Sequence, residues 1–404
     1  MDSLNDKSIK LKSLYRGDIP EIFNEFRLLN NQWERVDQIL KNHKLPPYEV
    51  IIHPTCTCNL RCKWCIGQNL KTGQIESEVV KENLINPDEM LKVVKNLCSF
   101  VEHRTIRIGD HFEEKEYAIE NVSFSGLIGE PLTAKESVLS AMEYLCTQNK
   151  RVGIFTNGLL IDDQIAEVFS NINYVLISLD AANNETYNYM KCASQKNDCF
   201  DKVVNNIRLL NDVKKRNCSN LDINIGFVVN QYNYKEILDA AKLMKGIGVH
   251  YFRLKFDIAI KLKLSPDELS AVSEQIKYIR ENIEDDYFKL VEIHKMSEVI
   301  TSDQNRNFNT CLINKLFGAI GPDGGLYACN YHAKKGGILL GDLLHESFSK
   351  IWSRTDHSDV GKCPFVCDPF KNRANNMLNA LKELHDTASN EDFYKTMELM
   401  GIGL

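Results

Sequence analysis

Short apolar runs alternate with amphipathic stretches through the middle of the chain. The apolar runs are rich in β-branched residues and bounded by turn residues, which is typical of buried strands; they lie at residues 49–53, 121–125, 152–156, 174–179, 221–229 and 251–256. Helical spacing follows between them, at residues 87–100, 135–149, 160–170, 184–215 and 233–247. Such alternation indicates parallel βαβ units. Because their crossovers are right-handed, residues 49–260 are predicted to form an α/β fold, a partial (β/α)6 barrel.

The pattern changes on both sides of this barrel. Residues 1–48 predict an N-terminal helical extension that ends at Pro46-Pro47. The charged residues 104–120 predict a hairpin inserted before the second strand. The later parts are a connecting region at 261–310 with a helix (264–282) and a short strand (289–294), a small C-terminal domain at 311–370 that holds four cysteines, and a helical tail at 371–404.

Composition and charge narrow the class of protein. The 404 residues carry 49 Lys and Arg against 55 Asp and Glu, a net charge of −6, which argues against a generally basic nucleic-acid-binding surface. No apolar run is long enough to span a membrane. The polar start from Met1 to Lys7 lacks the apolar core of a signal peptide. We therefore expect a cytoplasmic protein without a nucleic-acid or membrane partner.

The thirteen cysteines change the picture, because clustered cysteines in such a chain indicate metal or redox chemistry rather than disulfides. Cys58, Cys62 and Cys65 follow the first strand with three and then two residues between them. Three thiolates can hold three irons of a [4Fe-4S] cluster, which leaves the fourth iron open for another ligand. A structural zinc site is the alternative, with Cys56 or His53 as fourth ligand.

A CxxxCxxC loop behind a first strand resembles the signature of the radical S-adenosylmethionine (SAM) superfamily. The ends of the next three strands carry further matches. Gly129-Glu130 resembles the GGE-type motif of that family, Thr156-Asn157-Gly158 its TNG motif, and Ser178-Leu179-Asp180 its SLDG motif with alanine in place of glycine. Each motif alone is also typical of a turn or a helix cap. Their order behind the cysteine loop carries the resemblance.

The resemblance implies that SAM binds the open iron and is split into a 5′-deoxyadenosyl radical, which removes a hydrogen atom from the substrate. It assigns Glu130 to the SAM amino group, and Lys191, where relatives carry arginine, to the SAM carboxylate. Lysine keeps the charge but loses the bidentate fork. The cofactor-binding residues implied in this way are Gly129, Glu130, Asn157, Ser178, Asp180, Lys191 and Trp64.

A second set of cysteines lies near the end of the chain, at Cys311, Cys329, Cys363 and Cys367. The sequence around them resembles the SPASM/twitch extension of radical SAM enzymes. Four cysteines suit the shorter twitch form, which implies one fully ligated auxiliary [4Fe-4S] cluster. Zinc bound by four cysteines, or unliganded buried thiols, are the alternatives.

Arg253, Lys255 and Asp257 alternate at the end of the sixth strand, so they share one face, where they either bind substrate or form an ordinary salt-bridged strand end. The thiols Cys56, Cys192 and Cys199 are possible hydrogen donors, with inert buried thiols as the alternative. We expect a radical SAM oxidoreductase or epimerase acting on a sugar, aminocyclitol or nucleoside, with an external electron donor such as flavodoxin or ferredoxin. The alternatives are a peptide-modifying radical SAM enzyme and a non-catalytic zinc-binding protein.

Overall fold

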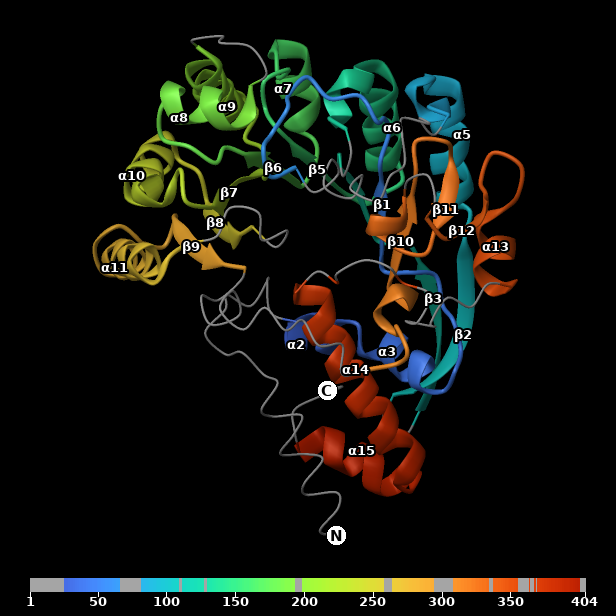
Figure 1. Cartoon of the computed structure of the whole chain (residues 1–404). Helices are drawn as coiled ribbons and strands as arrows, with labels where there is room; N and C mark the ends of the chain where they lie inside the picture. The colour runs from blue at the N-terminus through green and yellow to red at the C-terminus, as the bar shows by residue number, and fades with distance from the viewer. Residues whose placement is uncertain are drawn as a thin grey trace.

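A computed structural model describes residues 25–65, 81–108, 111–126, 129–192, 198–257, 264–293, 308–333, 337–354, 363, 367 and 369–399. Its main feature is a curved ten-stranded sheet (Figure 1). The strands lie in the order β12 (Leu339–Asp342), β11 (Gly325–Tyr327), β10 (Phe317–Ile320), β1 (Glu49–Ile52), β4 (Asn121–Phe124), β5 (Arg151–Thr156), β6 (Tyr174–Ser178), β7 (Asp222–Val229), β8 (Tyr251–Phe256) and β9 (Lys289–Glu292). Neighbours from β10 to β9 are parallel, so the six predicted barrel strands are confirmed as one contiguous parallel block, β1 to β8.

Helices cover the outer side of this sheet (Figure 1). They are α5 (Pro87–Cys98), α6 (Lys135–Thr147), α7 (Asp163–Phe169), α8 (Asn184–Lys191), α9 (Cys199–Arg216), α10 (Ile237–Ile247) and α11 (Pro266–Asn282). Asn86, Asp162 and Asn183 cap the starts of α5, α7 and α8 by accepting a hydrogen bond from a backbone N–H two or three residues on. The predicted helix 184–215 is α8 and α9, between which residues 193–197 lie outside the described part.

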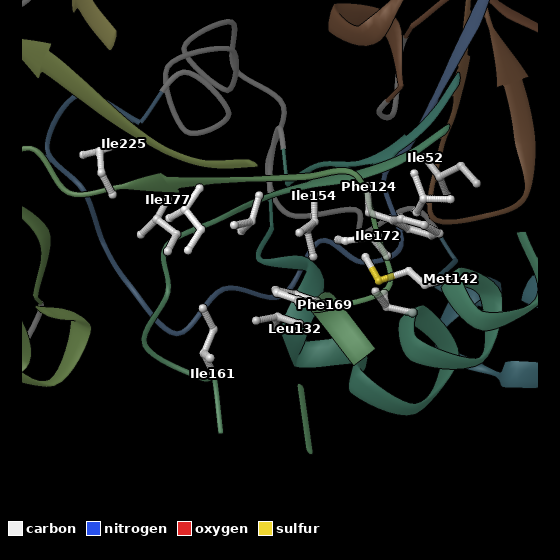
Figure 2. Packing of buried hydrophobic residues seen from close by; sticks show 14 of the residues in the cluster. Ile52, Phe124, Leu132, Met142, Ile154, Ile161, Phe169, Ile172, Ile177 and Ile225 are labelled. Atoms are coloured by element: carbon white, nitrogen blue, oxygen red, sulfur yellow. The ribbon is translucent and has the colours of Figure 1, made fainter. Parts of the chain in front are cut away.

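The main core lies between the sheet and these helices. Apolar strand residues such as Ile52, Phe124 and Ile154 point toward buried helix and loop residues (Figure 2). Because successive strand residues face opposite ways, the residues between them face the inner side. That inner side is polar: Glu49 accepts a 2.9 Å hydrogen bond from Ser123.

The strands β10, β11 and β12 extend the sheet beyond β1. β10 and β11 form a hairpin, in whose turn Gly324 takes the positive φ of 83° that favours glycine. Leu343 and Leu344 follow β12 into the main core, and α13 (Phe348–Arg354) packs there too.

The N-terminal and C-terminal helices meet on the other side of the molecule. A second apolar core joins α2 (Glu25–Asn31), α3 (Trp33–Leu40), α14 (Pro369–Thr387) and α15 (Asn390–Leu399) to the residues just before β10. The predicted hairpin is β2 (Val101–Ile108) with β3 (His111–Ala118). Arg35 of α3 fixes its base through an ion pair with Glu120 at 2.7 Å.

Five single-turn 3-10 helices complete the described elements, at Asn83–Ile85, Pro131–Ala134, Tyr234–Glu236, Ile313–Lys315 and Asn330–His332. Within the described residues, no helix combines the length and the apolar character that a membrane span requires.

Candidate active site at the carboxyl end of the sheet

The loop with Cys58, Cys62 and Cys65 leaves the carboxyl end of β1, and all three thiols are partly buried. Backbone hydrogen bonds fix the loop against the end of α8: the N–H of Arg61 donates to the carbonyl of Lys191 at 2.8 Å, and the N–H of Lys63 donates to that of Met190 at 3.0 Å. The sequence order thus brings the loop to the mouth of the parallel sheet, where active sites of such folds lie.

The three thiols also interact electrostatically. Burial raises the pKa of Cys62 to about 12, opposed by the positive charge of Lys191 and reinforced by Cys65 and Cys58. Burial likewise raises the pKa of Cys58. Buried thiolates need positive compensation, which a metal cluster supplies. The donor set therefore fits a cluster held by three cysteines.

A single zinc ion is the alternative occupant of this loop. Zinc holds each sulfur at about 2.3 Å, which draws its ligands tightly around one point. Within the described residues, no three His, Cys, Asp or Glu side chains lie close enough together to hold one metal ion. His53, the alternative fourth ligand, bonds its Nδ1 to the carbonyl of Ser125 at 2.9 Å, and burial lowers its pKa to about 4.

The Gly129-Glu130 motif lies directly against the cysteine loop. The N–H of Glu130 donates to the carbonyl of Thr57 at 2.8 Å. A Cβ atom on Gly129 would lie 2.2 Å from the carbonyl oxygen of Thr55, so only glycine permits this approach. The motif and the loop are therefore positioned by one another.

The Glu130 side chain turns inward and joins the motifs of two strands. Its carboxylate is buried and accepts hydrogen bonds from Thr156 Oγ1 at 2.6 Å, the N–H of Asn157 at 2.8 Å and the N–H of Leu132 at 3.1 Å. Burial raises the pKa of Glu130, against the lowering effect of these donors. Asn157 in turn donates to Asn59 in the cysteine loop at 2.7 Å. The contact with a SAM amino group stays a prediction.

Asp180 and Lys191 form a buried ion pair beside the same loop. Lys191 Nζ lies 2.8 Å from Asp180 Oδ2 and also donates to the carbonyl of Ser178. The other carboxylate oxygen of Asp180 accepts from the N–H of Val228 at 2.7 Å. Burial lowers the pKa of Lys191, but Asp180, Tyr187 and Cys62 outweigh it and raise the pKa overall. The predicted binding of the SAM carboxylate by Lys191 would use an ammonium group that already donates to Asp180 and to the carbonyl of Ser178.

The remaining predicted residues surround this centre. Trp64 is buried within the cysteine loop, and the partly buried Cys192 follows α8. On β8, Phe252, Leu254 and Phe256 are buried, whereas Arg253, Lys255 and Asp257 alternate with them and are less buried. The alternation places Arg253 and Lys255 on the inner face of β8, and Asp257 follows the strand; their shared role stays a prediction.

Of the C-terminal cysteines, Cys311 lies shortly before β10 and Cys329 shortly after β11. Burial raises the pKa of Cys311 to about 11; Cys329 and Cys363 raise it further, while Lys371 lowers it. Because these groups affect one another electrostatically, the three thiols lie near each other. Cys367 is partly buried, while its neighbours 364–366 and 368 lie outside the described residues.

Two asparagines that sequence reasoning missed hold these loops in place. Asn59 links the cysteine loop to Asn157. The fully buried Asn375 of α14 accepts from the N–H groups of Leu312 and Ile313, at 2.6 and 3.0 Å, and so fixes the turn that follows Cys311. The only sequence signal for Asn375 is a polar residue on the apolar face of a helix, which alone does not identify its partners.

Comparison with known proteins defines the class. Residues 52–244 match the Radical SAM superfamily, which identifies the barrel part of the chain as a radical SAM domain. The predicted fold is confirmed, and the family match supports the predicted use of SAM and a [4Fe-4S] cluster at the first cysteine loop.

Particular relatives differ in how much they share. The S-adenosylmethionine-dependent nucleotide dehydratase of Fibrobacter sp. (strain UWH6) is 27% identical over 189 residues, which are 46% of this chain and 49% of that protein. The cysteine-type anaerobic sulfatase-maturating enzyme of Clostridium novyi (strain NT) is 23% identical over 324 residues, 75% of this chain and 79% of that protein. Streptococcus suis SuiB bound to S-adenosylmethionine has a TM-score of 0.57 at 15% identity, with 87% of this chain and 74% of that chain covered.

Proposed function

We propose that this radical SAM enzyme removes a hydrogen atom from a small polar substrate, such as a sugar, aminocyclitol or nucleoside, and completes a dehydrogenation or an epimerisation. The observation that carries the proposal is the inner face of β8, where Arg253, Lys255 and Asp257 stand at the same end of the sheet as the cysteine loop. Two cations and one carboxylate suit a hydroxylated or anionic small molecule better than an apolar one.

The residues that would hold the first cluster and SAM are those that the fold gathers there. Cys58, Cys62 and Cys65 would ligate three irons, and Gly129 with Asn157 would frame the SAM site. When bound, cluster and SAM together supply a 5′-deoxyadenosyl radical that abstracts hydrogen from the substrate. The chain itself contributes orientation and exclusion of water, because Glu130, Asn157 and Asp180 are all at least nine-tenths buried.

The residues of β8 have separate roles in this proposal. Arg253 and Lys255 orient the substrate through hydrogen bonds and charge. A carbon radical next to an oxygen or nitrogen atom releases the proton of that O–H or N–H group more readily than the parent substrate does. Asp257 accepts this proton. Cys311, Cys329, Cys363 and Cys367 would hold a second cluster, which would supply an acceptor for the remaining electron in a dehydrogenation. An external electron donor such as flavodoxin or ferredoxin provides the first electron.

Iron counting tests the two cluster sites. Anaerobically reconstituted wild type should hold about eight irons, two clusters of four, and the Cys58→Ala and Cys363→Ala variants about four each. A wild-type count near four refutes the auxiliary cluster. A panel of deuterated substrates then tests the substrate class, since the true substrate transfers its label to 5′-deoxyadenosine. The Lys255→Gln variant should raise KM for that substrate and leave SAM cleavage without substrate unchanged.

A second candidate function is modification of a peptide side chain. The sulfatase-maturating relative covers three quarters of this chain, and SuiB was also solved bound to precursor peptide SuiA. The same label-transfer assay separates the two candidates. Label transfer from a deuterated peptide, with none from the small-molecule panel, would favour the peptide.

A further inference from the structure

Tyr187 of α8 carries a buried hydroxyl group that the mechanism has not used. Its side chain is fully buried, and the hydroxyl has no hydrogen-bond partner among the described residues. A buried polar group left without a partner costs about 1–3 kcal/mol, so native proteins seldom keep one. Its position beside a candidate cofactor site indicates a partner that is in place only when the cofactor is bound.

The position of Tyr187 shows where that partner lies. Tyr187 precedes Lys191 by four residues and shares its face of α8, and Lys191 Nζ lies 5.0 Å from the centre of the tyrosine ring. The cysteine loop rests on the end of the same helix through the Arg61 and Lys63 amides. Cys62, which lies between these two residues in the chain, is thereby held close to Tyr187.

Electrostatics agree with this placement. Burial raises the pKa of Tyr187, Lys191 lowers it, and Cys62 and Asp180 raise it again. A tyrosine hydroxyl ordinarily keeps its proton at neutral pH, so it is available as a donor. Asp180 is not the acceptor, because its carboxylate oxygens bind Lys191 and the amide of Val228 and neither receives the Tyr187 hydroxyl. The remaining electron-rich groups near the hydroxyl are the sulfur atoms of Cys62 and Cys192, and of these two only Cys62 belongs to the predicted cluster ligands.

We propose that Tyr187 is a positioning residue of the first iron–sulfur cluster: its O–H donates a hydrogen bond to the Cys62 sulfur or to an adjoining cluster sulfide, and Lys191 supplies the nearby positive charge. The inference rests on the proposed role of the cysteine loop. Reduction adds one negative charge to the cluster, so a donor at its sulfur stabilises the reduced form more than the oxidised form and raises the reduction potential.

The test compares Tyr187→Phe with wild type, both as full-length protein reconstituted anaerobically. Phenylalanine keeps the ring and removes only the hydroxyl. In a redox titration followed by electron paramagnetic resonance, the cluster signal that changes on SAM addition identifies the first cluster. At a fixed potential, we expect the ratio of reduced to oxidised first cluster in Tyr187→Phe to be about tenfold lower than in wild type. This corresponds to a decrease in reduction potential of about 59 mV for one electron.

Tyr117→Phe is the matched control. Tyr117 is also buried, but its hydroxyl donates to Glu34 at 2.9 Å, at the β2–β3 hairpin. We expect Tyr117→Phe to be less stable than wild type and to leave the reduction potential of the first cluster unchanged. A SAM-responsive cluster at full iron content with an unshifted potential in Tyr187→Phe overturns the role of Tyr187 alone. A wild type without any SAM-responsive cluster overturns both this inference and the proposed function.

A measurement without substitution covers the case in which Tyr187→Phe fails to hold its cluster. Wild type grown with tyrosine labelled with carbon-13 at Cζ should show a carbon-13 hyperfine coupling to the reduced, SAM-responsive cluster. Its absence overturns the hydrogen bond.

Discussion

The buried Asp180–Lys191 pair gives the sharpest test of the site geometry. We consider Asp180→Asn and Lys191→Met, singly and together. Asparagine suits position 180 because Asp180 has a positive φ of 61°, which asparagine tolerates better than most residues. Each change removes one charge and keeps the approximate size of the side chain.

The magnitude follows from burial. The two side chains are 3% and 2% exposed, with the charged atoms 2.8 Å apart. Removing one partner leaves the other charge buried and uncompensated, which costs about 3–5 kcal/mol. Removing both avoids that penalty, so the double variant should be less destabilised than the sum of the two single variants by roughly 1–3 kcal/mol.

Urea unfolding of the anaerobic protein, with all four forms reconstituted in parallel, measures these values. Iron content is determined on the same samples, because Lys191 also supports the cysteine loop through its carbonyl group. The reasoning is refuted if each single variant loses less than about 1 kcal/mol, or if the two losses add without coupling.

Three further predictions address neighbouring features. Gly129→Ala should stay folded but lose SAM binding in calorimetry, because the new methyl group meets the carbonyl of Thr55; normal affinity would contradict this. His53 protonates near 6.5 when unfolded but only near pH 4 when folded, so unfolding free energy should fall by up to about 3 kcal/mol as pH drops through that interval; His53→Gln should flatten the curve, and the exposed His345→Gln should not. Asn375→Ala should lose about four of eight irons, those next to Cys311, in an iron assay, because two buried amides lose their acceptor; an unchanged count would exclude this role.

Much of the sheet is predictable because each strand carries its own local signal. The predicted strand 251–256 coincides with β8, and the strand predicted at 121–125 exceeds β4 by one residue. The attachment of β10 to β1 has no such signal, since the Ile52–Ile320 pairing joins residues far apart in the chain. Only tertiary structure determines which edge of the sheet the C-terminal strands extend.

The candidate site divides in the same way. The three cysteines of the first loop are contiguous in sequence, so their common location is predictable. The directions of the Glu130 and Lys191 side chains are not, because both depend on partners from other strands. Tyr187 looks like any apolar helix residue in the sequence, and only its burial without a hydrogen-bond partner distinguishes it.

The parallel pairing of β1 with β10 has a consequence for dissecting the protein. Glu49–Ile52 pairs along its full length with Phe317–Ile320. The strand that leads into the first cysteine loop and the strand that follows Cys311 are therefore joined by backbone hydrogen bonds. Cutting the polypeptide after residue 310 would strip that ladder and leave an apolar strand edge open to self-association. We therefore expect the two fragments to be obtained as folded protein only when they are co-expressed. We also expect the distance between the two proposed metal centres to vary little with temperature.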